Sequence, residues 1–189
     1  AYDMFGLFGT KNAESELDYT AASANSNSCP TIMAHCVHST DEEIQMIKDQ
    51  GVYIAHCPES NTDIASGIAP IRRYLDMGLH VGLGTDVAGG FSLSMFRAIA
   101  DTIQVSKLRW RLAPVTLEEA FYMATIGGGS FFGKVGSFEK GYEFDAMILD
   151  DHNIRHPQEI STRDRLERLV YLSDDRNLVG KYVQGRKVI

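Results

Sequence analysis

The sequence predicts an α/β fold in which parallel strands alternate with helices. Three short apolar runs, residues 31–36, 52–58 and 80–86, have the length and composition of buried strands. Each run is followed by a stretch with helical periodicity, which is the βαβ pattern of a parallel sheet. This alternation fits both a doubly wound sheet and a (β/α) barrel, and it does not by itself decide between them.

Start and stop signals indicate where the helices lie between these strands. We expect the first helix to begin at a capping box formed by Ser39 and Glu42 and to end at Gly51, because glycine readily takes the backbone conformation that closes a helix. Further helices are expected over residues 68–77 and 92–108. Each would return the chain to the start of the next strand or lead it out of the α/β part.

After residue 110 the pattern becomes richer in β-structure. One more helix is expected from Thr116 to the glycines at 127–129. Residues 135–150 then have the pattern of a turn, a strand and an acidic edge. Residues 168–189 contain two strand-like stretches around a polar segment, with a hairpin turn at Gly185.

These patterns divide the chain into two parts. Residues 1–134 form the α/β part, and residues 135–189 form a β-rich segment outside it. The polar stretch 9–29 is rich in small residues, so we expect an exposed insertion there, away from any site.

Composition excludes several classes of function. The formal net charge is −7 and no basic run is interleaved with aromatic residues, so a nucleic-acid polymer is not an expected partner. No apolar stretch approaches the roughly 20 residues that cross a bilayer, so no membrane partner is expected. The three cysteines form no CxxC pair, which favours free thiols in a reducing compartment such as the cytoplasm.

Each predicted strand of the α/β part ends on a polar residue whose side chain can bind a ligand or take part in catalysis. These residues are His35, His56 and Asp86. Because ligands bind at the carboxyl ends of parallel strands in α/β folds, we expect the three to share one site. The remaining histidines and two of the cysteines are expected to be structural: His38, His80, His152 and His156 on loops or the surface, and Cys36 and Cys57 as buried small apolar residues.

The glycine-rich stretch around Asp86 raises two nucleotide-binding possibilities, and both fail. In "GLGTDV" a dinucleotide fingerprint would need a third glycine where Val87 stands, and no lysine follows to make a P-loop. Two interpretations of Asp86 remain. It caps the next helix, or the glycines let the backbone approach a bound group on which Asp86 acts. An aspartate beside histidines suits a divalent cation such as Zn²⁺.

Four stretches of the sequence resemble the C-terminal portion of the guanine deaminase family, within the amidohydrolase superfamily. They are "MAHCVHST", "IAHCPESNTDIASGIAPI", "GLGTDVAGGFSLSM" and "YLSDDRNLVGKYVQGRKV". The combination "HCPxSN" with "GTD" is shared widely by deaminases and chlorohydrolases of the superfamily. The stretches "GTDVAGG" and "DDRN…YVxGR" are narrower and favour guanine deaminase.

The resemblance implies a fold and a partial site. Residues 1–134 would supply strands six to eight of a (β/α)₈ TIM-type barrel, and residues 135–189 would supply strands of a small β-sandwich. In the family the metal is held by a His-x-His pair, a further histidine and the aspartate that matches Asp86. The sequence has no His-x-His, and "HCVH" has the wrong spacing to place two ligands on one strand face. We therefore expect a fragment that is inactive alone.

The resemblance also implies an activity, a cofactor and residue roles. The reaction is the zinc-dependent hydrolytic deamination of guanine to xanthine and ammonia, in purine catabolism or salvage, by a cytoplasmic homodimer. Asp86 would ligate Zn²⁺ and accept a proton, His35 would hydrogen-bond to the reacting group, and His56 would line the substrate pocket. Two alternatives stay open: an amidohydrolase for another amino- or chloro-substituted heterocycle, and a catalytically inactive scaffold.

Overall fold

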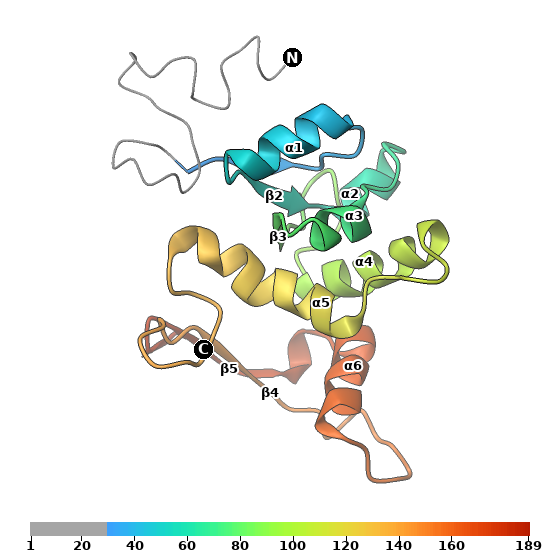
Figure 1. Cartoon of the computed structure of the whole chain (residues 1–189). Helices are drawn as coiled ribbons and strands as arrows, with labels where there is room; N and C mark the ends of the chain where they lie inside the picture. The colour runs from blue at the N-terminus through green and yellow to red at the C-terminus, as the bar shows by residue number, and fades with distance from the viewer. Residues whose placement is uncertain (1–29) are drawn as a thin grey trace.

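The structure is a computed structural model and describes residues 30–189 (Figure 1). The expected insertion at 9–29 lies outside the described residues. Within residues 30–189 the strands form two three-stranded sheets, one parallel and one antiparallel. Helices α4 and α5 lie between the parallel sheet and the segment that carries β4, β5 and α6, as Figure 1 shows.

The parallel sheet confirms the predicted strand–helix alternation. Its strands are β1 (Ile32–Ala34), β2 (Tyr53–His56) and β3 (His80–Leu83), in that order. Both pairings are parallel, so the three carboxyl ends lie at the same edge. The connecting helices, together with the helix that follows β3, are α1 (Asp41–Asp49), α2 (Pro58–Asp63), α3 (Ile71–Asp76) and α4 (Met95–Arg109).

Besides shifts of up to three residues at the ends of α3 and α4, the helices differ from the predicted ones in two places. The capping box of α1 is formed by Thr40 and Glu43, one residue later than Ser39 and Glu42: the Thr40 hydroxyl accepts from the Glu43 amide at 3.2 Å, and the Glu43 carboxylate accepts from the Thr40 amide at 2.8 Å. Helix α2 was not predicted, because the strand predicted over residues 52–58 includes Pro58, the first residue of this helix. Proline at position 58 favours a helix start, because its missing N–H is not needed in the first turn.

The hydrophobic core lies between the parallel sheet and its helices. Side chains from the strands, such as Ile54 and Val81, are buried against Ile44 and Ile47 of α1 and Ile99 of α4. Burial of each such side chain contributes about 1.5–3 kcal/mol relative to exposure, so this layer holds the three strand ends in fixed positions.

The second part of the structure contains mixed elements. They are α5 (Leu117–Tyr122), a π-helical turn η2 (Met123–Gly127), η3 (Ser130–Phe132), β4 (Ala146–Leu149), α6 (Thr162–Leu172), η4 (Asp175–Asn177), β5 (Leu178–Val183) and β6 (Arg186–Lys187). The expected helix at Thr116, the strand within 135–150 and the hairpin at Gly185 are all present.

The first strand-like stretch of residues 168–189 was predicted wrongly. Residues 168–172 form the last turns of α6, which Ser161 caps by accepting a hydrogen bond from the Asp164 amide at 3.1 Å. Leu166, Leu169 and Val170 follow helical spacing and are buried or half-buried on one face. A short apolar run is ambiguous between strand and helix, and here the apolar face toward α4 decides in favour of helix.

Two glycines allow the end of η2 to approach strand β3 closely. A Cβ atom on Gly82 would lie 2.8 Å from the Cα of Gly128, which is shorter than any real contact, whereas a Cβ on Gly128 would meet nothing closer than 3.4 Å. We therefore expect Gly82→Ala to lower the free energy of unfolding by about 1–3 kcal/mol, as overpacking does. The measurement is urea unfolding of the chain.

Gly128→Ala is the matched control from the same contact. Alanine is favoured over glycine in helical backbone by up to about 1 kcal/mol, so this variant should unfold at an equal or higher urea concentration. Equal losses of stability in the two variants would contradict a role for the close approach at Gly82.

No helix among residues 30–189 combines the length and apolar character that crossing a membrane requires.

Candidate metal and catalytic site

His35 and Asp86 lie side by side at the carboxyl edge of the parallel sheet. His35 directly follows β1, and its amide donates to the Ala55 carbonyl at 2.9 Å; Asp86 follows β3 by three residues. Both have a positive φ, 67° and 50°, a conformation that is uncommon outside glycine and often found at functional sites. The His35 Nε2 and Asp86 Oδ2 atoms are 3.7 Å apart. The prediction that these two strand ends converge is confirmed.

Asp86 is not a helix cap. The N-cap of α4 is Ser94, whose hydroxyl accepts a hydrogen bond from the Arg97 amide at 3.3 Å. The side chain of Asp86 is 41% exposed, and among residues 30–189 its ion-pair partner is His35 rather than a lysine or arginine. The carboxylate is therefore available to a bound group.

Asn61 orients His35 from the neighbouring helix. Its Oδ1 atom lies 2.9 Å from His35 Nδ1, and the Asn61 residue is only 1% exposed. An amide oxygen only accepts hydrogen bonds, so His35 donates from Nδ1 in this contact, and Nε2 is the ring nitrogen that faces Asp86. No role for Asn61 is predicted from the sequence, although the "HCPESN" stretch contains it.

Glu59, in the same stretch, fixes the loop that carries Asp86. The residue is 4% exposed, and its Oε2 accepts a hydrogen bond from the Ser92 amide at 2.9 Å; its Oε1 lies 3.8 Å from the Arg97 Nε. A Cβ on Gly90 would come within 2.8 Å of Glu59 Oε2, so the glycine is needed where the loop passes this carboxylate. The buried Glu59 side chain thus holds the loop to α2.

Cys57 is buried beside the pair, at the end of β2. One ligand atom from each of His35, Cys57 and Asp86 can be chosen so that all three lie within 4.8 Å of one another. Burial raises the pKa of the Cys57 thiol to about 11, and the nearby charge of Asp86 adds to the effect. Cys36 is buried too, and burial raises its pKa to about 11. Both cysteines are buried as predicted, but the proximity of Cys57 to the site was not anticipated.

His56 is the last residue of β2, but unlike His35 and Asp86 it is buried. It is 1% exposed, and neither ring nitrogen has a hydrogen-bond partner within the described part of the chain. Burial lowers the pKa of His56 to about 3, and repulsion from His35 adds to the shift. His56 is therefore a neutral interior residue under ordinary conditions.

The low pKa of His56 predicts a loss of stability in acid. Between pH 6.5 and about 3 the unfolded chain binds a proton at this residue that the folded chain does not, so stability falls as the pH decreases through that range. The limiting slope is about 1.4 kcal/mol per pH unit from this group. Urea unfolding at several pH values should show a smaller slope in His56→Gln than in the unmodified chain. Equal slopes would contradict the prediction.

The remaining histidines lie on loops or at the surface, as predicted. His38 is exposed and hydrogen-bonds to the Ser66 carbonyl at 2.9 Å, and His80 is exposed and stacks on Tyr53. His152 pairs with Asp150 at 2.8 Å, and His156 is exposed on a loop. None of the four approaches the His35–Asp86 pair closely enough to join the ligand cluster.

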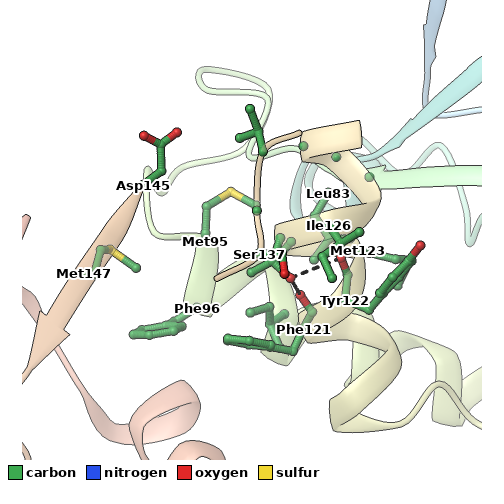
Figure 2. Close-up of a pocket in the computed structure, with 18 of the residues that line it drawn as sticks. Leu83, Met95, Phe96, Phe121, Tyr122, Met123, Ile126, Ser137, Asp145 and Met147 are labelled. Atoms are coloured by element: carbon green, nitrogen blue, oxygen red, sulfur yellow. Dashed lines mark hydrogen bonds between the residues drawn. The ribbon is translucent and has the colours of Figure 1, made fainter. Parts of the chain in front are cut away.

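A large cavity of the described residues lies apart from the His35–Asp86 pair. It has a volume of about 1420 Å³ and a mainly apolar lining, and His35, Cys57 and Asp86 do not line it. Figure 2 shows side chains of α5 and η2, including Phe121 and Ile126, facing Met147 of β4 across this space. The cavity separates the α/β part from the antiparallel sheet.

Comparison with known proteins identifies the family. Residues 7–188 match the model of the amidohydrolase family, and the chain belongs to that family. It is 39% identical over 169 residues to guanine deaminase of Dictyostelium discoideum, covering 84% of this chain and 38% of that protein. The chain therefore spans well under half the length of this curated relative.

Solved structures give the same result. A guanine deaminase from C. acetobutylicum with bound guanine in the active site aligns over 100% of this chain and 42% of its own, with 46% identity and a TM-score of 0.85. An adenosine deaminase from Xanthomonas campestris with bound zinc aligns over 82% of this chain and 36% of its own, with 25% identity and a TM-score of 0.72.

Proposed function

We propose that this chain forms part of a zinc-dependent guanine deaminase, which converts guanine and water to xanthine and ammonia. The observation that carries the proposal is the His35–Asp86 pair, 3.7 Å apart at the carboxyl ends of two parallel strands. The similarity to guanine deaminases, at 39% and 46% identity, supports the choice of substrate.

In this proposal the parallel sheet is an arc of a larger barrel. Strands β1, β2 and β3 correspond to strands six, seven and eight of a (β/α)₈ TIM-type barrel, and β4 to β6 belong to a small β-sandwich. Two facts support this assignment. The chain matches 36–42% of the lengths of the three proteins compared, and large apolar residues of the antiparallel sheet, such as Met147, Ile148 and Val179, are about half exposed.

The residues around Asp86 fit a bound zinc ion. The Asp86 carboxylate has no lysine or arginine partner among the described residues and is 41% exposed, and a carboxylate oxygen is a donor that Zn²⁺ accepts. Asp86 would hold the metal with one oxygen. The other ligands of the family pattern would come from the part of the relatives that this chain does not match.

The roles of the two side chains follow from their positions. When bound, zinc lowers the pKa of a coordinated water to about 7, which supplies a nucleophile at neutral pH. Asp86 uses its second oxygen to accept the proton of the attacking water. His35 accepts a hydrogen bond at Nε2 and orients that water toward the amino-bearing ring carbon, because Asn61 keeps the His35 proton on Nδ1. His56 is assigned to the wall behind His35.

The same proposal extends to the substrate, location and oligomeric state of the enzyme. Its partner in the reaction is the small molecule guanine, it acts in the cytoplasm, and it is a homodimer. Gel filtration and localisation of the tagged protein test these two statements separately from the activity.

The experiment that tests the function is a substrate comparison with an enzyme that contains this segment together with the remainder of an amidohydrolase. Release of ammonia is measured from guanine, adenine, adenosine and an amino- or chloro-substituted triazine. Turnover of guanine well above the others supports the proposal. Preference for another heterocycle would favour the broader amidohydrolase alternative, and no turnover of any, with zinc bound and the fold intact, would favour the inactive scaffold.

A further inference from the structure

We propose that Tyr74 is a positioning residue for His35: its buried hydroxyl holds the backbone turn that aims the His35 ring at Asp86. The effect on catalysis rests on the proposed function, in which His35 orients the attacking water. Tyr74 belongs to α3 and lies outside the four stretches that resemble the guanine deaminase family, so no motif assigns it a role.

The turn that carries His35 has an unusual backbone. His35 and Cys36 are consecutive, and both have a positive φ, 67° and 48°. The Cys36 amide donates to the Ala34 carbonyl at 2.8 Å, so His35 is the central residue of a three-residue turn. The positive-φ form of such a turn is rare and strained, and two left-handed residues with side chains in a row add to the strain. A strained turn persists only where the surrounding structure holds it.

Tyr74 supplies a contact that holds this turn from the helix layer. Its hydroxyl donates to the Cys36 carbonyl at 2.6 Å, across 38 residues of sequence. Tyr74 is 0% exposed and Cys36 is 6% exposed, so water does not readily replace the hydroxyl as donor. Burial raises the pKa of Tyr74 to about 12, so the hydroxyl keeps its proton at neutral pH. Loss of this donor would leave a buried carbonyl unpaired, which favours a different turn conformation.

Three elements together hold His35 in place. Its amide donates to Ala55 of β2 at 2.9 Å, its Nδ1 contacts Asn61 of α2, and the next carbonyl along the chain accepts from Tyr74 of α3. The result is the separation of 3.7 Å between His35 Nε2 and Asp86 Oδ2. A change of backbone conformation at the turn would move the whole imidazole, and a displacement of about 1 Å at a catalytic group can cost on the order of 100-fold in rate.

Tyr74→Phe tests this role, because it removes the hydroxyl and keeps the ring that packs in the core. In an enzyme that contains this segment and the remaining metal ligands, we expect kcat for guanine to fall by about 10–100-fold. KM and zinc content should change by less than about twofold, because the hydroxyl acts on the His35 turn. Tyr53→Phe is the matched control and should keep normal kcat: Tyr53 is buried at the amino end of β2, where its ring stacks on His80.

A second pair of variants distinguishes support of the turn from a general packing role. Glycine adopts a φ of 48° without the strain that a side chain causes, so Cys36→Gly should make the Tyr74 hydroxyl less necessary. We expect the loss of kcat caused by Tyr74→Phe to be at least about threefold smaller in the Cys36→Gly background. Equal losses in the two backgrounds, or equal kcat values for Tyr74→Phe and Tyr53→Phe, would overturn the proposal.

Crystal structures of the unmodified protein and of Tyr74→Phe test the turn without reference to activity. We expect the variant to lose the positive φ at His35 or Cys36 and to show a distance above 3.7 Å between His35 Nε2 and Asp86 Oδ2. An unchanged turn would refute the role of Tyr74. Failure of the unmodified enzyme to deaminate guanine would instead refute the proposed function, and the two crystal structures would still decide whether Tyr74 positions His35.

Discussion

Asp86→Asn is expected to reduce guanine turnover by at least about 10³-fold in an enzyme that contains this segment and the remaining metal ligands. Asparagine keeps the shape of the side chain but removes its charge and its ability to accept the proton of the attacking water. Loss of a general base alone costs about 10²–10⁴-fold, and weaker metal binding adds to it. Steady-state deamination and zinc content are measured on the same samples.

Asp76→Asn is the matched control for this variant. Asp76 is an exposed aspartate near the end of α3 that pairs with Arg72 at 3.0 Å, and Arg72 keeps a second partner in Glu119. Exposed ion pairs contribute about 0–1 kcal/mol, so turnover and zinc content should stay close to those of the unmodified enzyme. Near-normal turnover and full zinc content in Asp86→Asn would show that the carboxylate does not act in the reaction.

His35→Ala is expected to lower turnover by about 10²–10⁴-fold while the zinc content remains high. The reason is that His35 orients the attacking water in our proposal and is not one of the metal ligands. The contrast with Asp86→Asn is therefore the informative result: both variants lose activity, but only the aspartate variant also loses metal.

His38→Ala provides the comparison for a neighbouring histidine. His38 is exposed and its ring contacts the Ser66 carbonyl at 2.9 Å, away from the ligand cluster, so its removal should change turnover little. Loss of zinc in His35→Ala equal to that in Asp86→Asn would instead make His35 a ligand and would revise the assignment of roles.

The parallel sheet and the convergence of its strand ends could be predicted from the sequence. Apolar and helical runs alternate over the whole of residues 31–108, and this repeated pattern predicts the parallel sheet. The prediction does not change because one capping residue is placed at Ser39 instead of Thr40. The secondary structure of residues 168–172 was harder to predict. Five residues, part polar and part apolar, are compatible with a strand or a helix, and the element against which they pack decides between the two.

The histidine and aspartate of the site were predictable, but the residues that support them were not. His35 and Asp86 stand out because they end strands in a repeating pattern. Asn61 and Glu59 act across 26 and 33 residues of sequence, through contacts to His35 and Ser92, and no local pattern records such contacts. Cys57 was expected to be an ordinary buried residue, since its distance from Asp86 depends on how the loop after β3 folds back.

The hydrogen bond between Glu59 and the Ser92 amide makes that amide a reporter of the site. Because the loop from Gly84 to Ser94 is secured to α2 mainly through this buried carboxylate, opening of the loop must break the bond and expose the Ser92 N–H to exchange with solvent. The exchange rate of this one backbone proton is therefore expected to report how often the loop that carries Asp86 opens. A ligand that holds Asp86 in place should slow this exchange before it changes any property of the core.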